Sequence, residues 1–155
     1  QAMRLLVIDH LQAMLDPATM TVLAGAAATG ESLARRLTEH PLRLHPMTAA
    51  PPSQPLLLVG LASEVERYLA RHDLPSRPAE LGAAADTATA WVWTTERRGG
   101  TPLTVIAARD EAALAALARP LPHYGRQSWL VFDGSKAITR GVWPSRPQHV
   151  AFGGD

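Results

Sequence analysis

The sequence contains no cysteine and only one lysine, Lys136. Without cysteine the chain can have no disulfide, no thiol nucleophile and no thiolate metal ligand. This absence fits the cytoplasm, and it also fits a periplasmic protein that needs no disulfides. Arginine carries the other positive charges, and the formal net charge is only +1. So small a net charge predicts neither a nucleic-acid partner nor an acidic solvating tail.

Long hydrophobic runs are also missing. No apolar stretch approaches the roughly 20 residues needed to cross a bilayer, so no membrane span is expected. The first residues, Gln1, Ala2 and Met3, lack the charged and apolar regions of a signal peptide. The sequence leaves open whether these residues are native and whether a leader or a larger neighbour precedes them. The length of 155 residues and the 46% hydrophobic content predict one domain over 1–155.

Strand and helix signals alternate over the first two thirds of the chain, and hairpin signals follow. One hairpin is expected from the strands 87–95 and 103–108, with its turn at Arg97–Gly100, and a second from the strands 128–132 and 137–142. The predicted strands are 4–10, 19–24, 42–47, 56–60, 87–95, 103–108, 128–132 and 137–142. The predicted helices are 31–40, 63–72 and the segment after Asp110. A proline-rich stretch at 49–55 predicts an internal crossover. This pattern favours an α/β fold with a mixed sheet of about five to seven strands and about three helices, in a Rossmann-like three-layer architecture. A purely parallel doubly wound sheet is the alternative.

Two helix starts carry capping signals. Ser63 and Glu66 have the spacing of a capping box, and Asp110 is a typical N-cap residue. The helix after Ser63 repeats apolar and aromatic positions at helical spacing, which predicts one buried stripe. That stripe is Val65, Tyr68, Leu69 and His72. The helix after Asp110 carries Leu114, Leu117 and Leu121, and it is expected to end near Pro120–Pro122.

A degenerate phosphate loop follows the strand predicted at 19–24. Gly25 and Gly30 have the spacing of the pattern Gly-x-x-x-x-Gly-Lys-Ser/Thr, and Ser32 stands at the hydroxyl position. Glu31 replaces the lysine, so its carboxylate would repel the phosphate that a lysine attracts. The segment therefore predicts a structural strand-to-helix turn without nucleotide binding.

No known catalytic motif is present in the sequence. It contains neither His-Glu-x-x-His nor Gly-x-Ser-x-Gly. His40 and His45 flank Pro41, and we interpret them as residues of a surface loop. We therefore assign no catalytic, cofactor-binding or metal-binding residue, and expect no cofactor in this chain.

The aromatic residues are concentrated near the C-terminus. They form the candidate set for ligand binding or docking, together with two neighbouring polar residues: Trp91, Trp93, His123, Tyr124, Arg126, Trp129 and Trp143. Aromatic side chains can stack on sugars or bases, but they also fill the space between a sheet and its helices. Strand alternation places Trp91 and Trp93 on one face, and we expect Trp91 to be buried. For Trp129 a buried and an edge position remain open.

One stretch resembles a known family. Residues 121–134 read LPHYGRQSWLVFDG, and the stretch continues to residues 141–144, which read GVWP. They resemble a segment outside the catalytic domain of some bacterial zinc aminopeptidases of the aminopeptidase-N-like (gluzincin) superfamily. The superfamily's catalytic signature is missing here, so no catalytic or zinc-binding residue is carried over. The resemblance implies an accessory domain of a larger exported or periplasmic peptidase, with zinc held in the parent's catalytic domain.

Three functional hypotheses follow. The first is a non-catalytic accessory or docking domain whose partner is a neighbouring catalytic domain or another protein. The second is a free-standing α/β module for a small ligand or carbohydrate, which would use the Gly25–Gly30 turn or the aromatic face. The third is an unrecognised enzyme whose residues converge only in three dimensions. The resemblance implies a periplasmic or exported location; without the resemblance, a cytoplasmic location is expected.

Overall fold

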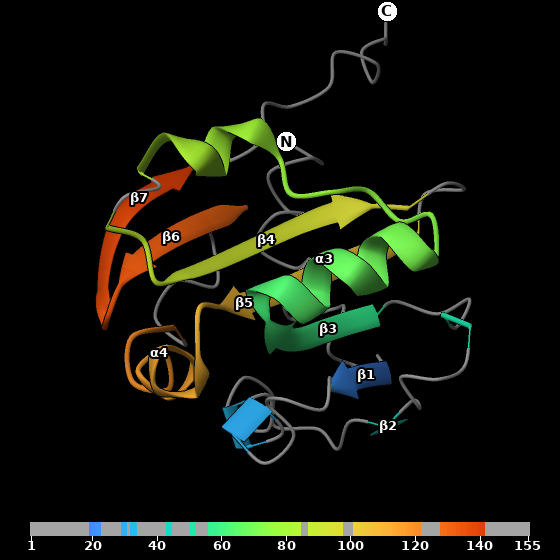
Figure 1. Ribbon diagram of the computed structural model, residues 1–155, viewed down its shortest axis with the longest axis horizontal. Helices are drawn as coiled ribbons and strands as arrows, with labels where there is room; N and C mark the ends of the chain where they lie inside the picture. The colour runs from blue at the N-terminus through green and yellow to red at the C-terminus, as the bar shows by residue number, and fades with distance from the viewer. Residues whose placement is uncertain are drawn as a thin grey trace, which may run out of the picture.

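The computed structural model describes residues 19–22, 29–30, 32–33, 43–44, 50–51, 56–84, 87–97, 101–121 and 128–141. These residues form a seven-stranded sheet in the order β2-β1-β3-β5-β4-β6-β7 (Figure 1). The strands are β1 (Thr19–Val22), β2 (Arg43–Leu44), β3 (Leu56–Leu61), β4 (Ala90–Glu96), β5 (Pro102–Ala108), β6 (Trp129–Asp133) and β7 (Lys136–Gly141). The helices with defined bounds are α3 (Ala62–Arg71), the 3-10 helix η2 (Ala79–Ala84) and α4 (Glu111–Ala115). Residues 29–30 and 32–33 are also helical.

The sheet is mixed, as the sequence predicts. Strands β2, β1, β3 and β5 run parallel to one another. Strand β4 is antiparallel to both β5 and β6, and β7 is antiparallel to β6. Both predicted hairpins, β4–β5 and β6–β7, are confirmed. In the second, Gly134 has φ +61°, a left-handed conformation that glycine adopts without a steric penalty.

The two faces of the sheet have separate apolar cores. We call the side that packs against α3 and η2 the α3 face, and the side that packs against α4 the α4 face. On the α3 face, Val65, Leu69 and Leu81 pack over Leu56 and Leu58. On the α4 face, Leu33, Leu114, Leu117 and Leu121 pack over Leu57 and Val59. Because both faces of β3 are covered, its sequence is a continuous apolar run instead of an alternating one.

The start of α3 differs from the prediction. The helix begins at Ala62, its N-cap is Leu61 in an extended conformation, and no side chain caps it. The Ser63–Glu66 capping box is therefore wrong. Leu61 is also the last residue of β3, where it pairs with Ala108. The strand thus passes directly into the helix, and Ser63 lies within the first turn. Of the predicted stripe, Val65, Tyr68 and Leu69 are buried, whereas His72 at the C-cap is half-buried.

The N-cap of α4 is confirmed. Asp110 has an extended backbone, and its Oδ1 accepts a 2.8 Å hydrogen bond from the Ala113 amide. The α-helix itself is shorter than predicted, because it ends at Ala115. The chain continues in turns in which the Leu117 amide donates to the Leu114 carbonyl and the Leu121 amide to the Leu117 carbonyl. These turns still bring the three predicted leucines onto the α4 face.

Replacing Asp110 with alanine is expected to lower the free energy of unfolding by about 1 kcal/mol. The variant loses the acceptor for one of the free amides at the start of α4. Asp110→Asn keeps a side-chain oxygen at the same position and should lose much less. Urea denaturation followed by circular dichroism measures both variants. Equal stability of Asp110→Ala and the wild type would show that the cap contributes nothing.

Several predicted elements lie outside the described residues. They are the strand at 4–10, the helix at 31–40 beyond residue 33, and most of the crossover at 49–55. Strands β1 and β2 fall within the predicted strands 19–24 and 42–47. Both β2 and β3 pair in parallel with β1, from opposite sides.

Candidate functional site

The topology singles out one end of the sheet. After β1 the chain forms β2, which lies next to β1 on the side away from β3. After β3 and α3 the chain forms β4 and β5, which lie on the other side of β3. The strand order therefore reverses between β1 and β3. In open α/β sheets, ligands bind outside the carboxyl ends of the strands at such a switch point. The degenerate phosphate loop follows β1 at this end; its residues Gly25 and Glu31 lie outside the described residues.

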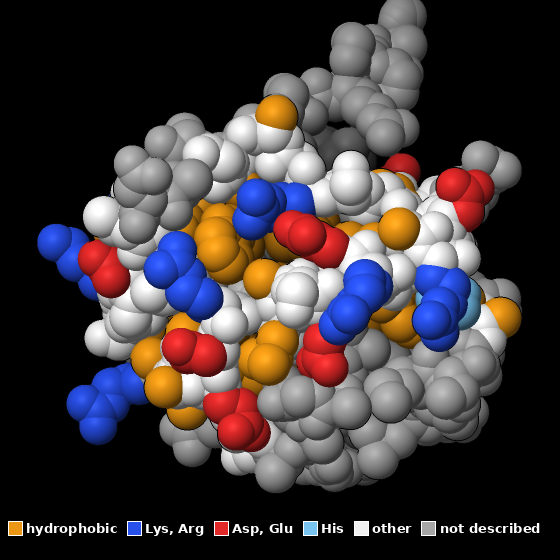
Figure 2. Space-filling model, in the orientation of Figure 1, with side chains coloured by type: hydrophobic (Ala, Val, Ile, Leu, Met, Phe, Trp, Pro, Cys, Tyr) orange, Lys and Arg blue, Asp and Glu red, His pale blue; other side chains and the backbone are white. Residues whose placement is uncertain are grey.

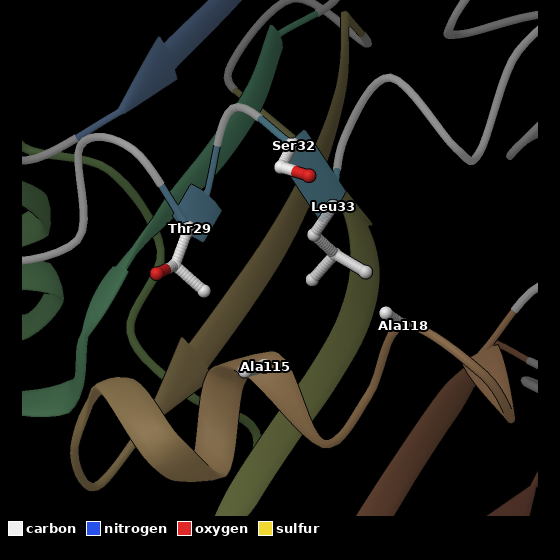
Figure 3. A pocket seen from close by; sticks show the side chains of 5 residues that line it. All are labelled: Thr29, Ser32, Leu33, Ala115 and Ala118. Atoms are coloured by element: carbon white, nitrogen blue, oxygen red, sulfur yellow. The ribbon is translucent and has the colours of Figure 1, made fainter.

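A cavity of about 300 Å³ lies beside this end, on the α4 face (Figure 3). Thr29, Ser32 and Leu33 line one side, and Ala115 and Ala118 line the other. The Leu33 side chain points toward α4 and is only 2% exposed, so it joins the cavity to the core of the α4 face. The cavity combines an apolar interior with two hydroxyl side chains, a composition typical of small-molecule sites.

One hydrogen bond connects the two sides of the cavity. The Thr29 hydroxyl donates to Glu111 Oε2 at 3.2 Å, although the two residues are far apart in the sequence. Thr29 belongs to the helical residues that follow β1, and Glu111 is the first residue of α4, which follows β5. The bond thus places a carboxylate next to a residue that lines the cavity. The sequence contains no signal for this pair, because it depends on how two distant segments pack.

The predicted aromatic face is partly described. Trp91 and Trp93 lie on the α3 face, where they are 7% and 1% exposed. The expectations that they share a face and that Trp91 is buried are confirmed. Trp129 pairs with Trp93 across β4 and β6 and is half-buried. The other candidates, His123, Tyr124, Arg126 and Trp143, lie outside the described residues.

The Arg77 guanidinium lies over the ring of Trp91. The guanidinium carbon of Arg77 lies 4.8 Å from the centre of the Trp91 ring, within the range of a cation–π interaction. The indole N–H groups of Trp91 and Trp93 are both buried and find no acceptor within the described structure. A buried donor without a partner is unfavourable. Both tryptophans therefore owe their place in the core to their large apolar rings.

Two side chains of the predicted α3 stripe, Tyr68 and His72, lie together near the end of the helix. The Tyr68 and His72 rings are 4.4 Å apart at an interplanar angle of 53°. Burial, reinforced by the charge of Arg71, lowers the pKa of His72 below its usual value. Burial also lowers the pKa of Arg97, an effect that Tyr68 partly opposes. The sequence marks Arg97 only as part of a turn, and its amide closes the β4–β5 turn by donating to the Thr101 carbonyl at 2.8 Å.

Within the described ranges, no three His, Asp or Glu residues lie close enough together to hold a metal ion. In the same ranges, no helix has the length and apolar character needed to cross a membrane. The two candidate sites for binding are therefore the cavity beside α4 and the tryptophans of the α3 face. No protein-family model, curated protein or solved structure matches this chain.

Proposed function

We propose that this chain is a non-catalytic accessory domain that docks on the catalytic domain of a larger bacterial hydrolase, a zinc aminopeptidase of the aminopeptidase-N-like class. The observation that carries the proposal is the apolar surface at the β6–β7 end of the α3 face. Trp129 of β6 and Ile138 of β7 pack against the core there and remain partly exposed. We name these two residues, Trp129 and Ile138, the tryptophan surface.

The tryptophan surface has the character of a docking site. Figure 2 shows hydrophobic side chains gathered over β4, between η2 and α3, with charged side chains around them. Apolar patches rimmed by charge mark interaction sites more often than random surface does. Tryptophan is also among the residues that carry most of the binding energy in protein interfaces.

The resemblance to aminopeptidase segments supports the choice of partner. The similar stretch includes the whole β6–β7 hairpin, from Trp129 to Gly141. A partner that binds the tryptophan surface would therefore contact the part of the chain that resembles the peptidase segment. The proposal includes an exported or periplasmic location for the protein. So does a Rossmann-like three-layer architecture, which is supported by the cores on both faces of the sheet.

The test begins with the full-length gene, which should also encode a catalytic domain with a His-Glu-x-x-His motif. Calorimetric titration of that domain with this chain should show saturable binding. Trp129→Ala should weaken binding at least about 30-fold, the effect of losing about 2 kcal/mol at an interface hot spot. Ile138→Ser should weaken it less. Arg119→Ala, an exposed change in the turns after α4, is the matched control and should bind like the wild type.

Thermal melts of each variant separate lost binding from lost folding. The proposal is overturned if the gene encodes no hydrolase domain. It is equally overturned if a folded Trp129→Ala protein binds that domain as tightly as the wild type.

A further inference from the structure

The cavity beside α4 has a topological cause. The helix that follows β3 packs on the α3 face, so no helix covers β3 directly on the α4 face. On that face, the helical residues after β1 lie on one side of β3 and α4 lies on the other. Strands β1 and β5 are two strand spacings apart, a distance of about 10 Å. Two helical segments that lie above these strands are therefore at the upper end of the distance between the axes of packed helices. Small side chains between two such segments leave space that large ones would fill.

The side chains at this place are small. Ala115 and Ala118 face the helical residues after β1, and the cavity lies between them and Leu33 (Figure 3). The volume of about 300 Å³ is at the lower end of the range for small-molecule sites. It suits a ligand with a short apolar body and is too small for a dinucleotide.

The polar groups beside the cavity select the charge of its ligand. The hydroxyls of Thr29 and Ser32 line it, and the exposed Glu111 carboxylate at its rim accepts a 3.2 Å hydrogen bond from the Thr29 hydroxyl. An ionised carboxylate only accepts hydrogen bonds, and it has about four lone-pair positions, of which this bond uses one. The group that complements it is a cationic donor, since a charge-assisted hydrogen bond is about twice as strong as a neutral one.

We propose that this cavity binds a small primary ammonium compound. Its short apolar chain lies against Leu33, Ala115 and Ala118, and its ammonium group donates to Glu111 and to the hydroxyl oxygen of Ser32. This inference is independent of the proposed docking function, because it concerns the opposite face of the sheet.

The probe is n-butylammonium, with n-butanol and butyrate as comparisons of the same chain length. We expect saturable changes in the amide NMR signals of Thr29, Ser32, Ala115 and Ala118 at millimolar n-butylammonium. Butanol should bind at least about 10-fold more weakly, because it lacks the charge. Butyrate should not bind, because its carboxylate faces Glu111.

Two variants test the two halves of the site. Ala115→Leu fills the cavity with a good helix former at an exposed helix position, and should abolish the signal changes with both probes. Glu111→Gln should weaken n-butylammonium at least about 10-fold and leave butanol unchanged. Glu66→Gln, an exposed carboxylate on α3, is the matched control and should bind like the wild type.

The amide spectrum of each free variant reports whether it is folded. Absence of saturable changes in the wild type would overturn the site itself, as would unchanged binding by Ala115→Leu. Binding of butyrate as tightly as n-butylammonium, or no effect of Glu111→Gln, would overturn the assignment of an ammonium ligand.

Discussion

Replacing Trp93 with alanine should lower the free energy of unfolding by about 3–5 kcal/mol, the usual loss for a large aromatic residue deleted from a core. Trp93 is only 1% exposed and belongs to the core of the α3 face. It lies on β4, an interior strand between β5 and β6, opposite Val105 on one neighbour and Trp129 on the other. Little around it can move to fill the space, because β4 is held by hydrogen bonds on both sides.

Three further variants make this prediction specific. Trp91→Ala should also lose about 3–5 kcal/mol, since Trp91 is nearly as buried. Trp129→Ala should lose less, because its half-buried ring is already partly in water. Trp93→Phe keeps an aromatic ring and removes an indole N–H that finds no acceptor in the described structure. Removing an unsatisfied donor offsets part of the lost packing, so this variant should lose no more than about 2 kcal/mol.

Guanidinium denaturation followed by far-ultraviolet circular dichroism measures all four variants without depending on tryptophan fluorescence. If Trp93→Ala unfolds at the same denaturant concentration as the wild type, β4 is not the centre of this core. If Trp93→Phe loses as much as Trp93→Ala, removing the indole N–H brings no gain that offsets the lost packing.

Replacing Gly141 with alanine should destabilise the β6–β7 hairpin by about 1–3 kcal/mol, the cost of overpacking a filled position. A Cβ at Gly141 would overlap Cζ2 of the Trp129 ring, since the two carbons would be much closer than van der Waals contact allows. The Trp129 ring must therefore move away from β7. Because Trp129 is half-buried, the movement should shift its fluorescence emission to longer wavelength.

Gly82→Ala is the matched control. A Cβ at Gly82 in η2 would meet no atom within 4 Å, so this change should be neutral or slightly stabilising. A double-mutant cycle locates the cause, since Gly141→Ala should cost almost nothing once Trp129 is also alanine. An equal cost in both backgrounds would show that the Trp129 ring is not what excludes a side chain at Gly141.

Elements with local signals are the ones that the sequence predicts. The β6–β7 hairpin follows from a turn containing Gly134, and α4 begins where Asp110 supplies its cap. Strand β3 is marked by its apolar run. The start of α3 is predicted wrongly, because pairing between Leu61 and Ala108 carries the chain directly from strand to helix. A distant strand thus overrides a capping pattern that is plausible by itself.

The candidate site is much less predictable than the fold. The aromatic pattern indicates the shared face of Trp91 and Trp93 because alternation along a strand is local. The cavity forms because α3 packs on the other face of the sheet and because Ala115 and Ala118 are small. The importance of these two alanines becomes visible only in the folded chain, where they lie opposite Leu33. The Thr29–Glu111 bond likewise joins segments that only the sheet brings together. No short window of sequence contains that information.

The strand order also determines how chain entropy is lost during folding. Strands β4 and β5 are joined by a short turn, so their pairing closes a small loop. Strand β3 instead pairs with β5, with Leu56 opposite Leu103 and with α3, η2 and β4 between them in the sequence. Loop-closure entropy grows with the length of the loop and is lost before the contacts compensate for it. Among the described strand pairs, β3–β5 closes the longest loop. Pairing at the centre of the sheet therefore costs the most chain entropy.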